Sequence, residues 1–285
     1  MHLRMRAVVA AVVVAAAVTA CNGRRGPLGP EYEYEEDLTL SLNGSATLIV
    51  NASVPALMAL RGLPLNPDPR SRGDQLKKQI EELYGSPYTR VGRISTWTRH
   101  GRRFVGIHLT VTDIRALSAT RPFSVEAYDL HEQGDQIAFR AALSKTGAAA
   151  APVPDAGWQG NEIVAFRLHL PARIRFHNSR DLQTNAPVSP ARGNILTWEQ
   201  RMTDRLAGKP IAYAEDKTPD VMEVRMDRES ILYRTLWLFG LAFLAALLVI
   251  AGLIWLTMRR GRETETGGNG DGENGDGGSE TEDRR

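Results

Sequence analysis

The stretch LTLSLNGSATLIV, residues 38–50, places Asn-Gly between two runs rich in apolar residues. In the first run, leucine alternates with polar residues from Leu38 to Leu42, which is the pattern of a strand with one buried face. Asn43 and Gly44 both tolerate the positive φ that the central positions of a type I′ turn need. The stretch therefore predicts an antiparallel hairpin that turns at these two residues.

Further strands are predicted around this hairpin. Residues 89–97 are expected to pair with 104–111 across 98–103, and 123–130 with 137–143 across 131–135. The later strand candidates are residues 162–170, 173–178, 194–200 and 220–227. Because strands outnumber helices and come mostly as neighbouring hairpins, we expect an α+β domain that is antiparallel and β-rich, with a few short helices.

Three short helices are predicted. Residues 54–62 form the first, and 113–119 form another that Thr112 or Asp113 can cap. The most regular is 74–84, with Asp74 as its cap and Gly85 as its end. Its apolar residues share one helical face, which indicates core packing rather than a ligand site: Leu76, Ile80, Leu83 and Tyr84.

The N-terminus reads as an export signal. Arg4 and Arg6 precede an apolar run that is too short to span a membrane, so residues 1–20 are predicted to be a cleaved signal peptide. Cys21, the only cysteine, ends the stretch VTAC, which resembles the bacterial lipobox. We predict that Cys21 is lipidated and that residues 21–35 form a linker. The alternative is a plain signal peptide with an incidental cysteine.

The C-terminus carries a membrane-span signal. Residues 236–258 contain no charge and, at 1.5 Å per residue, cover roughly 34 Å as a helix. Export would leave the preceding domain outside and place Arg259, Arg260 and Arg262 inside. With both ends anchored, the domain would be held at the outer face of one membrane. The acidic, glycine-rich residues 259–285 are predicted to be a disordered cytoplasmic tail.

Residues 36–230 remain as the exported domain, with a candidate subdomain boundary near 145–160 in a segment rich in alanine, proline and glycine. Residues 21–258 hold 28 Lys and Arg against 25 Asp and Glu, a formal charge of +3. A nearly neutral exported domain does not indicate nucleic-acid binding. The lone cysteine leaves no disulfide, so a hydrophobic core must stabilise the fold.

Catalytic and metal-binding patterns are not found. The sequence has no Gly-x-Ser-x-Gly elbow, no His-Glu-x-x-His and no P-loop. His169 and His177 lie in separate strand candidates, and without a carboxylate or thiolate at a suitable spacing we expect ordinary strand histidines. The carboxylates are scattered, and no two separate out as an acid and base pair. We therefore predict no enzyme, no cofactor and no metal site.

The clearest surface feature is TRHGRR, residues 98–103. It places Arg99, His100, Arg102 and Arg103 at a hairpin tip, where they are expected to contact anionic membrane lipids. The alternative is a solvated turn.

The layout resembles the LppM-like bacterial lipoproteins. The likeness rests on residues 38–50, on FRLHLPARIRFHNS (166–179) and on RGNILTWEQ (192–200), where Pro171, Gly193 and Trp198 keep the family's order. The helix at 74–84 and the insertion near Ala148 have no match in the family pattern. The resemblance implies an envelope lipoprotein with an α+β exported domain that handles lipids or glycolipids, with no established catalytic residues.

Together these features predict a membrane-anchored envelope lipoprotein that binds lipid, glycolipid or a protein partner at the outer membrane face. The alternative is a single-pass sensor or adaptor that couples the domain to a cytoplasmic partner through the acidic tail, and an enzyme comes third. A lipid-binding domain is expected to contain a large apolar cavity within the sheet and helices.

Overall fold

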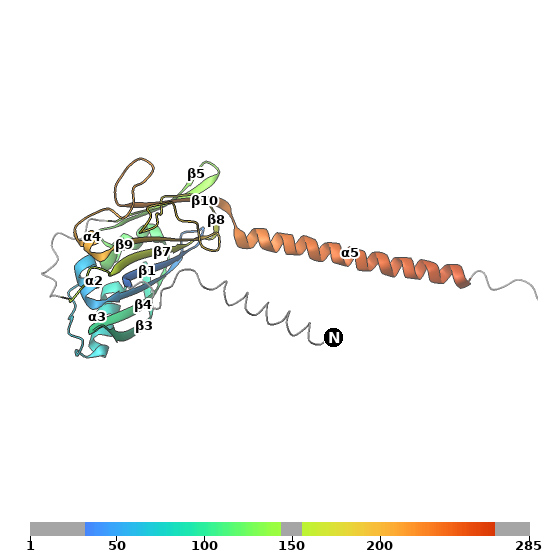
Figure 1. The fold of residues 1–285 in the computed structure, drawn as a ribbon. Helices are drawn as coiled ribbons and strands as arrows, with labels where there is room; N and C mark the ends of the chain where they lie inside the picture. Colours follow the sequence, from blue (N-terminus) through green and yellow to red (C-terminus); the bar gives the residue numbers. More distant parts are fainter. Residues whose placement is uncertain (1–31, 144–155, 266–285) are drawn as a thin grey trace, which may run out of the picture. The chain divides into compact units, whose positions relative to one another are not determined.

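The computed structural model describes residues 32–143 and 156–265, and its strands form two sheets (Figure 1). The six-stranded sheet has the order β3 (Thr89–Arg99), β4 (Arg102–Val111), β2 (Ala46–Ser53), β1 (Tyr32–Leu40), β7 (Ile163–His169) and β9 (Ile195–Arg201). The four-stranded sheet has the order β5 (Ala127–Gln133), β6 (Gln136–Ala142), β10 (Val221–Ser230) and β8 (Ala172–His177). The helices are α2 (Val54–Arg61), α3 (Gly73–Tyr84), η1 (Ile114–Ala119), η2 (Arg121–Phe123), α4 (Met202–Leu206) and α5 (Ile231–Glu265). The α+β prediction is confirmed.

The β1–β2 hairpin is confirmed, but its predicted turn type is wrong. Leu40 pairs with Ala46, and the Ser41 amide donates to the Ser45 carbonyl, so three residues, 42–44, form the loop. Gly44 alone has positive φ, at 90°. A two-residue turn at Asn43–Gly44 would slip the register by one residue and put Leu48 and Val50 on the face opposite Leu38 and Leu40. Burial of these apolar side chains together thus decides the register.

A two-residue turn with both φ values positive occurs instead in the β3–β4 hairpin. His100 and Gly101 have φ of 50° and 72°, and Arg99 pairs with Arg102 across them. The β5–β6 hairpin is equally tight, because Gln133 pairs with Gln136. Both hairpins confirm predicted strand pairs.

Each of the two sheets contains strands from before and from after residues 144–155. Strand β7 lies parallel to β1, and β10 lies antiparallel to β6. The candidate boundary near 145–160 therefore does not divide the folded residues. The parallel β1–β7 pair is the exception in otherwise antiparallel sheets.

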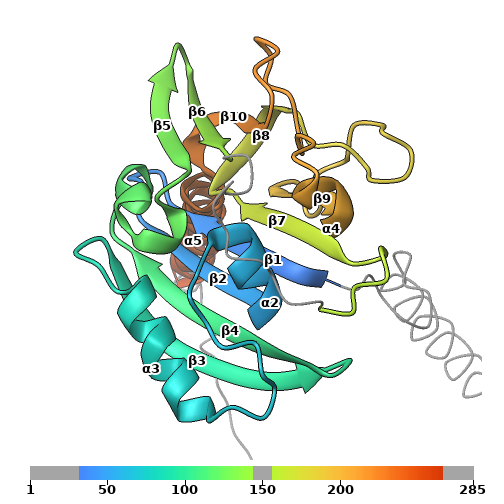
Figure 2. The same cartoon turned by 90° about the vertical axis from the view of Figure 1, so that its left-hand side faces the viewer.

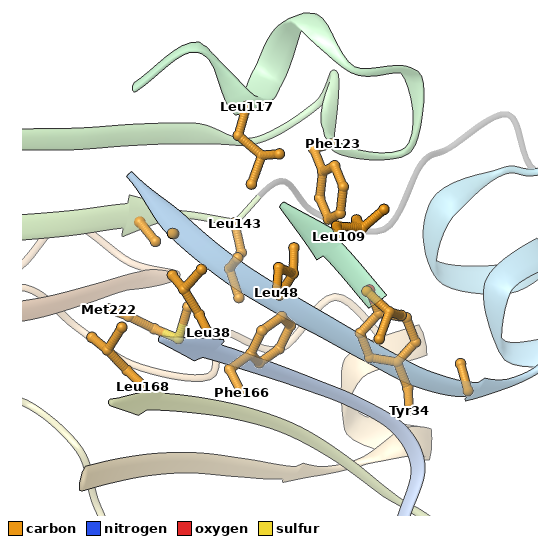
Figure 3. Packing of buried hydrophobic residues seen from close by; sticks show 14 of the residues in the cluster. Tyr34, Leu38, Leu48, Leu109, Leu117, Phe123, Leu143, Phe166, Leu168 and Met222 are labelled. Atoms are coloured by element: carbon orange, nitrogen blue, oxygen red, sulfur yellow. The ribbon is translucent and has the colours of Figure 1, made fainter. Parts of the chain in front are cut away.

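The core lies where the inward faces of the sheets and the helices meet. Leu38 and Leu168 of the six-stranded sheet approach Met222 of the four-stranded sheet (Figure 3). Helix α2 packs over β1, β2 and β4, and α3 packs beside β3 (Figure 2). Trp198, Tyr34 and Phe123 are among the largest fully buried side chains.

Two of the predicted helix-end residues, Asp113 and Gly85, are confirmed, and one, Asp74, is not. Asp113 caps η1 by accepting a hydrogen bond from the Arg115 amide at 3.0 Å. Gly85 follows the last residue of α3, as predicted. Asp74 is not the cap, because α3 begins at Gly73 with Arg72 in the capping position. Asp74 lies in the first turn, where its carboxylate interacts favourably with the positive end of the helix dipole.

Helix α5 forms a compact unit separate from the domain that ends at Ile231. Its apolar part, Ile231–Met258, has a mean hydropathy of 2.6 and is long enough to cross a membrane. Strand β10 ends at Ser230, and the Ile231 amide donates to the Pro171 carbonyl at 3.0 Å. The sheet therefore leads directly into this helix without a linker.

Candidate functional site

A buried arginine at the end of α2 organises the candidate site. The Ser53 side chain caps α2 by accepting from the Ala56 amide at 3.1 Å, and Gly62 ends the helix with φ of 61°. Arg61 is the last residue between these caps. Its side chain is 4% exposed, so a full positive charge is placed inside the core.

Two carboxylates reach Arg61 from distant parts of the chain. Glu36 comes from β1, where it shares the inward face with Leu38, and Glu126 follows η2. The Nη2 atom of Arg61 contacts Glu36 Oε1, and its Nη1 atom contacts Glu126 Oε1. Both carboxylate side chains are less than one-tenth exposed. One guanidinium therefore faces two carboxylates in a buried site.

Tyrosines complete this polar cluster, which we call the Arg61 cluster: Tyr34, Glu36, Arg61, Glu126 and Tyr128. Arg61 Nε donates to the Tyr34 hydroxyl at 2.7 Å, and that hydroxyl donates to Glu36 Oε1. The Tyr128 hydroxyl donates to Glu126 Oε2 at 2.5 Å. These bonds link β1, α2, the segment after η2, and β5.

Burial sets the titration of the cluster. It raises the pKa of Glu36 above its ordinary value, because the ionised carboxylate loses water, and Arg61 only partly offsets this. Burial alone would lower the pKa of Arg61, but the charges of Glu126 and Glu36 outweigh it and hold the pKa well above its usual value. Burial also raises the pKa of Tyr34 and Tyr128. Arg61 therefore stays charged, and Glu36 binds a proton more readily than an exposed carboxylate.

An apolar cavity adjoins the Arg61 cluster between the two sheets. It is small, with a volume of about 30 Å³. Most of its lining is apolar and comes from both sheets: Leu38, Phe139, Ala141, Phe166, Leu168, Trp198 and Met222. Glu36, Tyr128 and Arg167 supply its polar lining. A mainly apolar lining with a few polar groups is typical of small-molecule sites, but this cavity is about ten times smaller than such sites.

A second hollow, of about 10 Å³, lies on another side of the Arg61 cluster. Tyr34, Arg61, Glu126 and Arg205 supply its polar lining. Arg205 donates twice to the carboxylate of Asp220 at 2.7 Å, so its charge is balanced within the fold. We therefore treat the apolar cavity, and not this hollow, as the candidate ligand site.

Sequence reasoning missed this site, although signals for it exist. The carboxylates Glu36 and Glu126 were expected to stay scattered, but they meet at Arg61. Arg61 falls at position i+7 from Val54 and i+4 from Leu57, so it lies on the apolar face of its helix. Glu36 keeps the two-residue period of Leu38 and Leu40. When two elements each carry a charged residue at a core-facing position, and the charges are opposite, the pattern indicates a buried ion pair.

The predicted membrane-contact residues lie at the β3–β4 tip, but Arg102 is not on the surface. Its side chain is 8% exposed, with Nε 2.9 Å from Glu33 Oε1. Arg99 donates to the Tyr32 carbonyl, and Arg103 donates to the Pro69 carbonyl. His100 is exposed. Membrane contact by the other three residues stays a prediction, whereas Arg102 stabilises the start of β1.

The histidine strands do not build a metal site. His169 Nε2 lies 3.1 Å from Asp37 Oδ1, and burial lowers the pKa of His177, aided by the charge of Arg180. Across residues 32–143 and 156–265, no group of three or more histidine, cysteine or acidic side chains is placed to hold a metal ion.

Several predicted features lie outside the described residues. These are the signal peptide, Cys21 with most of its linker, and tail residues 266–285. The lipidation of Cys21 and the adaptor alternative, which depends on the tail, both stay predictions.

No protein-family model matches the chain, and no curated protein matches it. Among solved structures, the folded domain of the LppM protein of Mycobacterium tuberculosis, determined by NMR, matches with 11% sequence identity and a TM-score of 0.33. The match covers 72% of this chain and 95% of that domain. At this TM-score the likeness supports no conclusion about function, so membership of the LppM-like family stays a hypothesis from the sequence.

Proposed function

We propose that this protein is a membrane-anchored binding protein of the bacterial envelope, and that its folded domain holds one apolar chain of a lipid between the two sheets. The observation that carries the proposal is the apolar cavity beside the Arg61 cluster. Its side chains come from β1, β5, β6, β7, β9 and β10, so a bound chain would contact both sheets at once.

The size and chemistry of the cavity limit the ligand. The cavity holds about 30 Å³, room for one or two water molecules, which is far below the range of about 300 to 1,000 Å³ for small-molecule sites. A lipid chain could therefore bind only if the side chains that line the cavity moved apart to admit it. Phe139, Phe166 and Met222 offer apolar surface, and burial of such a chain against them would drive binding.

The anchoring signals support a lipid ligand. Helix α5 has the length and composition of a membrane span, and it starts directly after strand β10, which lines the cavity through Met222. The export signal would place the domain at the outer face of that membrane, close to a supply of lipid. The groups of the Arg61 cluster satisfy one another, which favours a binding role over catalysis.

Lipid analysis of matched variants tests the proposal. The full-length protein is purified from membranes, and the lipids that accompany it are measured by mass spectrometry. Ala141→Phe fills the cavity, because Ala141 lines it and is 1% exposed. Ala142→Phe is the control, because neighbouring strand residues point to opposite faces.

The comparison of variants separates cavity lipid from lipid around α5. We expect one lipid class to be lost from Ala141→Phe and retained in Ala142→Phe and in the parent protein. If the parent and Ala141→Phe carry the same lipids in the same amounts, the cavity does not hold a lipid chain and the proposal is wrong.

A further inference from the structure

Strand β3 forms an open edge of the six-stranded sheet. It is 11 residues long and pairs with β4 alone, so its other side has no neighbouring strand in the described part of the chain (Figure 2). Within the described ranges, backbone hydrogen bonds outside the strand ladders reach β3 only at Thr89, which bonds with Ser86. An unpaired edge presents a row of N–H and C=O groups with which another chain can pair.

The opposite edge of the same sheet is closed by the chain itself. On β9, Ile195 exchanges two backbone hydrogen bonds with Ala191, at 2.8 and 3.0 Å. The Thr197 carbonyl accepts a third from the Ser179 hydroxyl. The segment between β8 and β9 therefore occupies the edge of β9, whereas the described residues provide no such cover for β3.

The charged side chains of β3 are all positive. Its sequence, TRVGRISTWTR, contains three arginines and no acid. Arg90 and Arg93 are exposed, and neither forms an ion pair with another described residue. Arg99, by contrast, donates to the Tyr32 carbonyl and lies 4.3 Å from the centre of the Phe104 ring. Two positive charges near the start of this edge thus have no counter-charge in the fold.

These charges disfavour a second copy of β3 as the partner. Pairing of two such strands would bring arginine close to arginine, and like charges on facing strands are destabilising. The register shift between Val91 and Ile94 marks a bulge, and bulges also protect edges against self-association. An acidic strand would be attracted by the same arginines.

The two faces of β3 indicate how such a strand would be patterned. Val91 and Ile94 lie opposite Leu109 and Ile107 on the core side, and both are only partly buried. Apolar side chains of an added strand would cover them. Side chains of the other face would lie beside Arg90, which is exposed.

An exposed tryptophan adds a contact point on the outer face. Trp97 is 39% exposed and stacks on Phe104, with 5.6 Å between the ring centroids. In the described residues before α5, five large apolar side chains are exposed, and two of them, Tyr88 and Trp97, lie beside or on β3. Tryptophan, tyrosine and arginine are the residues that contribute most at protein interfaces.

We propose that the edge of β3 binds an extended segment of another protein in which acidic and apolar residues alternate, and that this segment adds a seventh strand to the sheet. Backbone hydrogen bonds would supply affinity, and the alternating side chains would supply specificity. The acids would face Arg90, and the apolar residues would cover Val91 and Ile94. The inference does not involve the cavity, so its test is separate from that of the proposed function.

Defined peptides test the docking edge. The full-length protein in phosphatidylcholine nanodiscs is titrated with fluorescent eight-residue peptides that alternate Glu with Val, Lys with Val, or Glu with Gly, and binding is followed by anisotropy. The Glu/Gly peptide has the charge of the Glu/Val peptide but a low strand propensity. Hydrogen–deuterium exchange then locates the amides that each peptide protects.

We expect the Glu/Val peptide to bind about tenfold more tightly than the other two, a ratio equivalent to about 1.4 kcal/mol, and to slow exchange selectively within residues 90–99. Arg90→Glu should weaken binding of the Glu/Val peptide and strengthen binding of the Lys/Val peptide. Arg201→Glu is the matched control, because it reverses an exposed arginine on β9, the opposite edge of the sheet. It should leave both affinities unchanged.

The same measurements identify the other possible occupants. If residues 90–99 are already protected without peptide and single-molecule photobleaching shows a dimer, a second copy occupies the edge. If phosphatidylglycerol nanodiscs alone protect these residues, the edge contacts the membrane. Either result overturns the proposal. It is also wrong if no peptide binds at millimolar concentration, if the Lys/Val peptide binds the parent protein as tightly as the Glu/Val peptide, or if Arg201→Glu acts as strongly as Arg90→Glu.

Discussion

Strand β1 carries carboxylates on both faces, and each face pairs them with arginine in a different environment. On the outer face, Glu35 lies 2.9 Å from Arg167, and these side chains are 14% and 30% exposed. On the inner face, Glu36 contacts Arg61, and the exposures fall to 7% and 4%. The same pair of residue types thus occurs once beside water and once inside the core.

The two faces differ in what the ion pair does for the fold. A pair beside water adds little stability, because solvent screens the attraction and the long side chains lose freedom. A buried pair adds little net stability for another reason, since both ions lose their hydration, but removal of one partner is strongly unfavourable. The Arg61 cluster should therefore act mainly as a constraint that holds β1, α2 and the segment at Glu126 in one arrangement.

Loss of the buried guanidinium should have the largest effect. Arg61→Met keeps an apolar stem but leaves Glu36 and Glu126 without their cation. We expect the free energy of unfolding to fall by about 3–5 kcal/mol, the usual result when one partner of a buried ion pair is removed. Urea unfolding of the full-length protein in nanodiscs, followed by tryptophan fluorescence, measures the change.

A triple variant identifies the cause of that loss. When Glu36→Gln and Glu126→Gln are added to Arg61→Met, no unpaired charge remains in the cluster. The triple variant should be more stable than Arg61→Met alone. If it is less stable, the loss comes from packing around the guanidinium and not from the unpaired carboxylates.

Disruption of the ion pair between Arg102 and Glu33, at the start of β1, should reduce stability less. Arg102 lies 2.9 Å from Glu33, which is fully buried, but Glu33 also accepts a hydrogen bond from Trp158 Nε1 at 3.0 Å. Arg102→Met leaves this second bond in place. We expect a loss of about 1.5–3 kcal/mol, the range for a hydrogen bond to a charged group. A loss of stability equal to that of Arg61→Met would show that the hydrogen bond from Trp158 does not stabilise the unpaired Glu33 carboxylate.

The pH dependence of stability should distinguish the inner face from the exposed acids. Burial raises the pKa of Glu36 above its ordinary 4.5, so its contribution is fully present below pH 4.5 and is lost as pH rises through the folded-state pKa. Hydrogen bonds with Thr218 lower the pKa of Asp216 from 3.8 to about 2, so its contribution is lost only as pH falls through this lower range. Glu36 and Asp216 therefore act in separate pH windows.

Two variants test this separation by unfolding measurements across pH. Glu36→Gln mimics the protonated acid, so its stability relative to the parent protein should improve as pH rises above 4.5. Asp216→Asn should change the curve only below about pH 4. A Glu36→Gln curve parallel to that of the parent would mean that Glu36 titrates as an exposed acid.

Local sequence patterns predicted most strands and the helices at α2 and α3, because each depends on neighbouring residues. The β1–β2 turn was predicted with the wrong type, since the burial of Leu48 and Val50 set the register against the preference of Asn43–Gly44. The parallel β1–β7 pair joins strands more than a hundred residues apart and has no local signal.

The Arg61 cluster was missed for a similar reason. Arg61 and Glu36 are 25 residues apart in the chain, and Glu126 is farther still. Periodicity shows that Arg61 and Glu36 each face the core, but it does not show that α2 packs on β1. Only the tertiary contact between these elements makes the two charges partners.

Removal of the arginine that pairs with carboxylates on the outer face of β1 should reduce stability least. Arg167→Met removes the contacts with Glu35 and Asp37, both of which stay accessible to water. Because water can solvate the two released carboxylates, we expect a loss of stability below about 1 kcal/mol that shrinks further at high salt. Urea unfolding at low and high salt, in a double-mutant cycle with Glu35→Gln, measures the coupling. A loss as large as that of Arg61→Met would mean that burial does not distinguish the two faces of β1.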